Sequence, residues 1–312
     1  MSAKHVELVE VGPRDGLQNE TISLDSALKV ELVLKLIAAG AKKIEIGSFV
    51  SPTWVPQMAD TSRVIKMVQD QLTGTGRSRK RVEFAALVPN RQGMNQALDL
   101  GLKEVAIFAS ATESFSKKNI NCSIKESFDR FIPVMVLAKK NHVKVRAHLS
   151  VSFGCPYEGS VSEAKVVRLA KKLVGLGCYQ ISIADTIGVA HAGQVDSLFR
   201  KLKVAIPVAK LAGHFHNTRG QALANVFAAY KLGVKVFDSS LGGLGGCPYA
   251  PGASGNVATE DLVYMFDGLK VKTGYSIKEL IEVSKWFENR TGRILPSMVS
   301  RAGLLMPKGM VE

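Results

Sequence analysis

Along most of its 312 residues the chain alternates between short apolar runs and amphipathic segments of helical period. Some of these runs, such as 82–88 and 103–109, contain apolar stretches without polar alternation, which is typical of strands that are covered on both faces. The apolar runs predict strands at 5–11, 42–46, 82–88, 103–109, 143–150, 179–184, 209–214 and 234–238. The helical patterns between them include Ser26–Ala39, Ser160–Leu176, Gln194–Lys203 and Gly220–Leu232, and several are followed by a glycine. Eight strand–helix units with short connections favour an α/β fold, a TIM (β/α)8 barrel, over an open sheet.

The predicted barrel takes up about residues 5–270, and a helical extension takes up about residues 271–312. Within this tail, Ile277–Arg290 has an amphipathic helical pattern. Its apolar face can cover the barrel or a partner subunit of a homodimer. We expect residues 1–312 to form a single catalytic domain, since α/β barrels commonly reach this length.

The sequence carries a formal net charge of +14. Its one dense basic run, Arg77–Arg81, contains no aromatic residue that could stack on a base. Because nucleic-acid binding needs a basic stripe with stacking residues or a known reader motif, we expect no nucleic-acid partner. A small polyanionic substrate suits the charge better. No apolar run reaches the ~18 residues that a membrane helix needs, so we expect no membrane partner either.

The termini and the cysteines favour a cytoplasmic location. Met1–Lys4 has no apolar signal core, and the last residues are not a peroxisomal signal, so we expect no targeting segment. The four cysteines show no CxxC spacing and no disulfide framework, which fits a reducing compartment. They are Cys122, Cys155, Cys178 and Cys247.

Polar side chains gather at the ends of the predicted strands, where the active site of such a barrel lies. Gly12–Gln18 places a cation beside an anion directly after the first strand. We expect one cavity to be faced by Arg14, Asp15, Gln18, Glu45, Ser48, His148, Ser150, Ser152, Ser182, Asp185, His214, His216, Cys247 and Asn256.

Part of this set predicts a metal site. His214 and His216 are two residues apart, so in a strand both side chains point to the same face. Asp15 comes from the neighbouring end of a closed barrel, and Asn256 adds a carbonyl oxygen. Two imidazoles, a carboxylate and an amide suit Mg²⁺ or Mn²⁺, while Zn²⁺ stays open. Alone, a His-x-His motif is as consistent with packing at a strand end.

The glycine-rich segment Leu241–Ala250 follows the last strand and lacks the GxGxxG spacing of a dinucleotide site. Four glycines before Cys247 predict a mobile lid that carries a thiol over the cavity. A thiol with a pKa of about 8.5 is a reasonable proton carrier near neutral pH. The alternative is a flexible loop with an incidental thiol.

These residues make the chain similar to the 3-hydroxy-3-methylglutaryl-CoA lyases, a family of metal-dependent barrel enzymes. The resemblance covers nearly the whole chain. It is carried by Val11–Glu20, Ser48–Pro52, Trp54–Met58, Gly154–Gly159, Asp185–Val189, His214–His216, Gly220–Asn225 and Gly242–Asp261. The last segment is specific for the lyases, because the related synthases lack its cysteine loop.

The resemblance implies cleavage of an acyl-CoA substrate, 3-hydroxy-3-methylglutaryl-CoA, to acetoacetate and acetyl-CoA, as in leucine breakdown. It implies a divalent cation at Asp15, His214, His216 and Asn256, with Asp15 counted also among the catalytic residues. It further implies that Arg14 stabilises the enolate oxygen and that Cys247 transfers a proton.

The remaining roles follow the same resemblance. Glu45 and Asp185 would hold the site and relay protons, although a role as simple ion pairs that brace Arg14 or a histidine is equally consistent. Gln18, Ser48 and Ser182 would orient the substrate. Arg219 departs from the family pattern and adds a cation near the metal, which leaves the preferred acyl group open.

Two other functions remain as alternatives. One is a related hydroxyacyl-CoA lyase or a Claisen-type condensing synthase, such as an isopropylmalate or homocitrate synthase. Cys247 and the lack of a long regulatory carboxyl-terminal domain argue against the synthase. The other is a non-catalytic barrel that binds an anion or a nucleic acid through its basic surface, against which the intact set of ligand residues argues.

Overall fold

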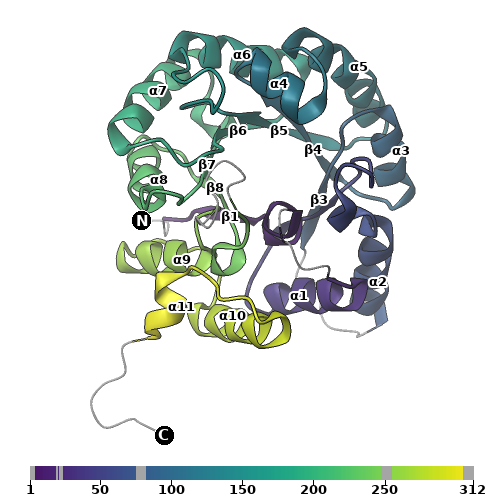
Figure 1. The fold of residues 1–312 in the computed structure, drawn as a ribbon, viewed down its shortest axis with the longest axis vertical. Helices are drawn as coiled ribbons and strands as arrows, with labels where there is room; N and C mark the ends of the chain where they lie inside the picture. Colours follow the sequence, from purple (N-terminus) through teal and green to yellow (C-terminus); the bar gives the residue numbers. More distant parts are fainter. Residues whose placement is uncertain (1–3, 19, 21–23, 75–81, 247–254, 305–312) are drawn as a thin grey trace, which may run out of the picture.

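The computed structural model describes residues 4–18, 20, 24–74, 82–246 and 255–304. Eight parallel strands form a closed barrel in chain order, with β8 beside β1, and helices surround it (Figure 1). The strands are β1 Glu7–Glu10, β2 Lys43–Ser48, β3 Glu83–Leu87, β4 Glu104–Ser110, β5 Lys144–Ser150, β6 Gln180–Asp185, β7 Leu211–Phe215 and β8 Val236–Ser239. The predicted TIM barrel is therefore confirmed.

The helices follow the strands in the expected alternation, with one addition after β4. They are α1 Ser26–Ala38, α2 Thr61–Gly74, α3 Arg91–Asp99, α4 Glu113–Ile120, α5 Ile124–Lys140, α6 Glu163–Leu176, α7 Ala192–Ala205, α8 Ala222–Lys231, α9 Thr259–Gly268, α10 Ile277–Thr291 and α11 Met298–Ala302. The short α4 was not predicted. Gly177 ends α6 with a φ of +111°, a left-handed conformation in which glycine carries no Cβ penalty.

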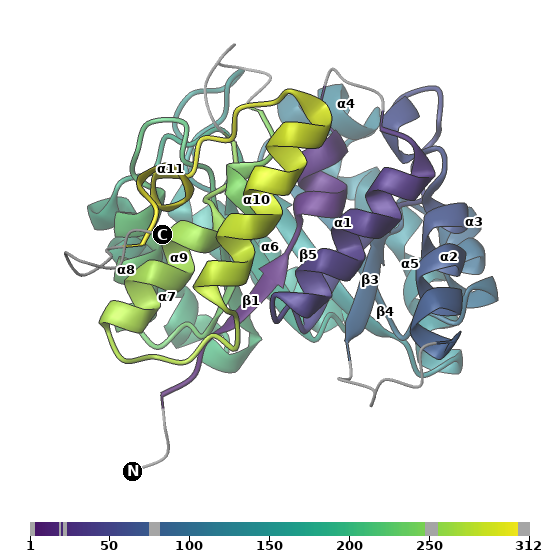
Figure 2. The same cartoon turned by 90° about the horizontal axis from the view of Figure 1, so that it is seen from below.

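The helical tail packs against the barrel. Helix α10 contacts α1 and α9 and lies beside α1 when the molecule is seen from the side (Figure 2). It buries Leu280, Val283 and Phe287 on one face, which explains its amphipathic sequence. No helix among the described residues is long and apolar enough to cross a membrane.

The strand ends carry two short turns that shape the site. A π-helical turn, Gly12–Gly16, follows β1 directly, and a 3₁₀ turn, Leu241–Gly243, follows β8. The backbone N–H groups of Asp15 and Gly16 both donate to the carbonyl of Val11, which winds the first turn tightly onto the end of its strand. Both turns contact each other, so the first and last strands of the barrel present their loops together.

Candidate active site

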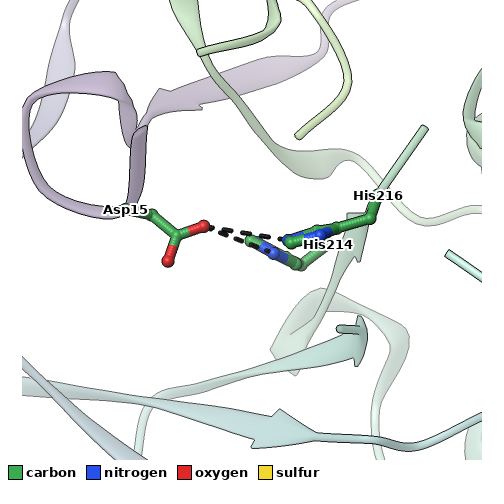
Figure 3. A group of neighbouring side chains, drawn as sticks. All are labelled: Asp15, His214 and His216. Carbon is green, nitrogen blue, oxygen red and sulfur yellow. Dashed lines mark ion pairs between the residues drawn. The ribbon is translucent and has the colours of Figure 1, made fainter. Parts of the chain in front are cut away.

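Three of the predicted metal ligands come together at the carboxyl end of the barrel (Figure 3). His214 lies in β7 and His216 follows that strand, so both rings face Asp15 on the turn after β1. Oδ2 of Asp15 is 3.9 Å from Nε2 of His214 and 3.9 Å from Nε2 of His216. Both histidines are buried, whereas Asp15 is partly exposed, which leaves the group accessible from one side.

Asn256 lies next to this group. It forms an isolated bridge with His216, and its Nδ2 donates a hydrogen bond of 2.8 Å to Oδ2 of Asp15. A half-turn of the amide exchanges its oxygen and nitrogen, so Asn256 is placed to offer a carbonyl oxygen to an ion held by the other three. Two imidazoles, a carboxylate and an amide fit a divalent cation. The described residues thus include a group that can hold a divalent metal.

Arg14 links Asp15 to a second carboxylate. Its Nη1 donates to Oδ1 of Asp15 over 2.6 Å, and its Nε donates to Oε1 of Glu45. The other oxygen of Glu45 is 3.0 Å from Nε2 of His148. Arg14, Glu45 and His148 are all buried, so this row of polar groups is shielded from water.

The charges in this row stabilise one another. Burial raises the pKa of Glu45, but the charge of Arg14 and then that of His148 outweigh it and lower the pKa to about 2. Burial also opposes the charge of Asp15, yet Arg14, His214 and His216 hold its pKa well below the usual range. Both carboxylates are therefore anions at neutral pH, and Glu45 is suited to hold Arg14 rather than to donate a proton.

Neither Ser182 nor Asp185 lines the cavity, and each side chain is hydrogen-bonded to another part of the protein. The hydroxyl of Ser182 donates to Oδ2 of Asp238 over 2.8 Å inside the barrel. The carboxylate of Asp185 accepts from the backbone N–H groups of Val189 and Ala190 at 2.9 and 3.0 Å, which braces the loop after β6. Burial raises the pKa of Asp185 against these hydrogen bonds.

The remaining predicted residues differ in their positions relative to the cavity. Gln18 lines it, whereas Ser48 is buried with its hydroxyl accepting from the N–H of Val50 and lies on a neighbouring hollow. The guanidinium of Arg219 donates to the carbonyls of Ile187 and Gly188, so this cation binds the loop after β6. Cys247 lies outside the described residues.

The sequence did not single out Asp238, a buried acid in β8. Its Oδ2 lies 3.2 Å from Nδ1 of His214, and its Oδ1 forms an ion pair of 2.7 Å with Arg146. The available signal was a charged residue directly after an apolar one inside each of two predicted strands, in Val236-Phe237-Asp238 and Val145-Arg146-Ala147. Such charges in buried strands occur when they are paired.

The cavity around these groups has a volume of about 190 Å³. One part of its wall is polar, with Arg14, Asp15, Gln18, His148, His214 and His216. The other part is apolar and includes Val50, Val55, Leu87, Phe108 and Phe115. A ligand with charged groups at one end and an aliphatic portion at the other fits this division.

Comparisons with known proteins show which family the chain is similar to. The model of the HMGL-like family matches residues 5–286. The 3-hydroxy-3-isohexenylglutaryl-CoA/hydroxy-methylglutaryl-CoA lyase of Pseudomonas aeruginosa is 50% identical over 282 residues, which are 90% of this chain and 91% of that protein. A crystal structure of hydroxymethylglutaryl-CoA lyase from Pseudomonas aeruginosa superposes with a TM-score of 0.91 at 48% identity, covering 96% of this chain and 97% of that one.

A second solved structure adds a bound ligand. An HMG-CoA lyase from Acinetobacter baumannii, in complex with coenzyme A and 3-methylmalate, superposes with a TM-score of 0.89 at 35% identity and covers 99% of this chain and 97% of that one. The barrel, the group at its carboxyl end and these likenesses over nearly the full length lead to one assignment. The chain belongs to the HMGL-like family.

Proposed function

We propose that this chain cleaves the C2–C3 bond of 3-hydroxy-3-methylglutaryl-CoA to give acetoacetate and acetyl-CoA, with Mg²⁺ or Mn²⁺ as the metal. The observation that carries the proposal is the approach of Oδ2 of Asp15 to Nε2 of both His214 and His216, 3.9 Å in each case. The high identity to a lyase that acts on this thioester supports it.

In this reaction the 3-hydroxyl loses its proton, the C2–C3 bond breaks, and its electron pair passes to the thioester enolate. A proton added at C2 then completes acetyl-CoA. The chemistry that a divalent cation supplies when bound by Asp15, His214, His216 and Asn256 is Lewis acidity, which favours ionisation of the hydroxyl.

Arg14 is proposed to stabilise the negative charge that develops on the enolate oxygen. It lines the cavity, and Glu45 and Asp15 hold its guanidinium from two sides. Because burial costs a lone cation more than a paired one, these two carboxylates keep Arg14 charged in the water-poor site. Asp185 supports the neighbouring loop in this proposal, and Gln18 contacts the substrate from the cavity wall.

Cys247 is proposed to carry the proton to or from the reacting fragments. The support comes from its neighbour in the chain, because Gly246 lines the cavity beside the histidines. Cys247→Ser is expected to lower turnover by about 10²–10⁴, the usual contribution of a general acid or base, while Mn²⁺ affinity stays unchanged. Normal turnover in this variant would remove the thiol from the mechanism.

The main test is product formation. Purified protein with Mg²⁺ or Mn²⁺ is expected to release acetoacetate and acetyl-CoA in equal amounts from 3-hydroxy-3-methylglutaryl-CoA, and chelation of the metal is expected to stop the reaction. His214→Ala is expected to lose both metal and turnover. Absence of product, in an assay where an authentic lyase is active, would overturn the proposal.

The apolar wall of the cavity indicates a second candidate substrate. The Pseudomonas aeruginosa relative is named for 3-hydroxy-3-isohexenylglutaryl-CoA as well, and Leu87, Phe108 and Phe115 offer apolar surface here. Comparison of kcat/KM for the two thioesters measures the preference. Ser48 and Ser182 lie away from the cavity lining, so their alanine variants are expected to change this ratio less than Gln18→Ala.

A cytoplasmic location and assembly into a homodimer stay predictions. Cell fractionation tests the first. Light scattering on the purified protein tests the second, and a mass of one chain at micromolar concentration would contradict it.

A further inference from the structure

Asp238 is the centre of a buried polar cluster inside the barrel and is the strand partner of His214. It lies in β8 and is 1% exposed. Its Oδ2 accepts from the hydroxyl of Ser182 over 2.8 Å and lies 3.2 Å from Nδ1 of His214. Its Oδ1 faces Nη2 of Arg146 at 2.7 Å. The carboxylate therefore bridges a fixed cation and one of the three residues around the metal position.

Arg146 stabilises the buried carboxylate of Asp238. It is 1% exposed, and its Nε donates to Oε1 of Gln180 over 2.8 Å, which fixes the guanidinium on β5 and β6. A buried carboxylate without a partner would be strongly destabilising, and the ion pair with Arg146 offsets much of that penalty. Asp238 can therefore stay negative in the barrel interior and act as an acceptor only.

A hydrogen-bond acceptor beside Nδ1 determines which nitrogen of His214 carries the hydrogen. Because Oδ2 of Asp238 has no hydrogen to give, Nδ1 of His214 must carry the hydrogen of this bond, and in the neutral imidazole, the form that binds a metal, Nε2 keeps its lone pair. Nε2 is the atom that faces Oδ2 of Asp15 at 3.9 Å. His148 packs edge-on against the same ring, with centroids 6.2 Å apart at 75°, which limits its rotation.

We propose that Asp238, anchored by Arg146, is a positioning residue that fixes the orientation and tautomer of His214 so that its Nε2 binds the divalent cation. This inference rests on the proposed function for the presence of a cation, and it goes beyond it by assigning a part to two residues outside the set proposed to hold the metal and the substrate. Metal-ligating histidines are generally oriented by such an acceptor on their second nitrogen, and its loss typically weakens metal binding 10–100-fold.

Asp238→Asn provides the first test, because it keeps the shape and removes one acceptor oxygen. Arg146 has only donors, so it takes the single amide oxygen and leaves the NH₂ group towards His214. Nδ1 must then accept, and the hydrogen moves to Nε2, the side that should bind metal. The expected result is a 10–100-fold loss of Mn²⁺ affinity, measured by titration of the metal-free protein.

A double variant separates positioning from simple loss of packing. In Arg146→Met with Asp238→Asn the guanidinium no longer competes for the amide oxygen, which can turn towards Ser182 and His214 and accept from Nδ1 of His214. This variant is expected to regain at least part of the Mn²⁺ affinity lost in Asp238→Asn. It also buries no unpaired charge, so it serves as the decisive protein if the single variant does not fold. Affinity no higher than in the single variant would show a merely structural role and overturn the inference.

A matched control lies at the opposite end of the barrel. Glu104 begins β4, is 2% exposed, and pairs with Lys43 over 2.9 Å. Glu104→Gln makes the same change of acid to amide in a buried ion pair far from the histidines. It is expected to lower the free energy of unfolding while Mn²⁺ affinity stays within twofold of the unaltered protein. An equal loss of affinity in this control would contradict the proposal.

A spectroscopic measurement completes the test without the reaction. In the metal-free protein, ¹⁵N shifts of His214 are expected to report hydrogen on Nδ1 in the unaltered chain and in the double variant, and on Nε2 in Asp238→Asn. The same tautomer in all three would overturn the inference. Protein that binds Mn²⁺ in this pattern but forms no acetoacetate would refute the proposed function alone.

Discussion

At the scale of single residues, the candidate site is held together by opposite charges that are buried beside one another. Arg14 touches Asp15 and Glu45, and each of these acids keeps its charge through that contact. Burial lowers the pKa of Arg14, but Glu45 and then Asp15 reverse this effect, so the net shift is upward. The guanidinium is therefore a permanent cation that points into the cavity from a turn held by two anions.

Arg14→Lys tests the geometry of this cation. Lysine keeps the charge but has no forked donors, so it cannot hold Glu45 and Asp15 at once. Turnover is expected to fall about 10²–10³-fold, as for the loss of one donor to a developing oxyanion, while Mn²⁺ affinity changes less than about tenfold. Steady-state kinetics and metal titration on the same preparation measure both. Unchanged kcat would show that charge alone suffices.

At the scale of elements, Glu10 joins the two turns that form the rim of the site. Its Oε1 accepts from the N–H groups of Gly12 and Leu241, both at 2.9 Å, and its Oε2 accepts from the hydroxyl of Thr259 at 2.7 Å. One side chain in β1 thus fastens the turn after β1, the turn after β8 and the start of α9. Burial raises its pKa to about 7 against these three hydrogen bonds.

Glu10→Gln is expected to reduce the dependence of stability on pH, while Glu260, whose pKa burial also raises to about 7, keeps the remainder. Between pH 4.5 and about 7 the folded protein holds a proton on Glu10 that the unfolded chain has released, so the free energy of unfolding falls as the pH rises and levels off above 7. This group accounts for up to about 3 kcal/mol of that fall. Urea unfolding at pH 5.0 and pH 7.5 measures the difference between the two proteins.

A control for this experiment lies on the same strand. Glu7 also belongs to β1, but its side chain is 43% exposed. Glu7→Gln is expected to keep the pH dependence of the unaltered chain. If Glu10→Gln keeps it too, the carboxyl of Glu10 titrates equally in the folded and unfolded states.

At the scale of the whole molecule, the helical tail is tied to the barrel through buried acids of α9. Glu260 accepts from the N–H of Gly242 at 2.8 Å and from the hydroxyl of Ser284 on α10. Asp261 accepts from the hydroxyl of Ser297 at 2.8 Å, which fixes the start of α11. The turn after β8 therefore depends on the tail, and we expect one domain that unfolds in a single step.

Phe287→Ala tests this cooperativity. Phe287 lies on α10 and is 1% exposed, so its truncation is expected to cost about 3–5 kcal/mol. Calorimetry is expected to show one transition that moves to lower temperature as a whole. Ile294→Ala, at a residue 74% exposed in the same tail, is expected to leave it unchanged. A new low-temperature transition in Phe287→Ala would show that the tail unfolds by itself.

The sequence alone determined the order and type of most elements, and the positions of the groups at the strand ends. Apolar runs, helical periods and glycine stops are local patterns, and a closed parallel barrel brings all carboxyl ends to one rim. For this reason Asp15, His214 and His216 could be expected together although they lie some 200 positions apart. The short α4, with its polar sequence between two longer elements, gave no comparable signal.

Only the tertiary structure decided which polar side chains reach the cavity and which hold others in place. Ser182 and Asp185 both belong to β6, yet one hydroxyl bonds Asp238 and the other side chain bonds its own loop. Asp238 and Arg146 meet across the barrel interior, from strands that are not neighbours. Strand periodicity predicts whether a side chain points into the barrel. Which residue it meets there depends on the stagger between the strands, and this stagger is set when the barrel closes.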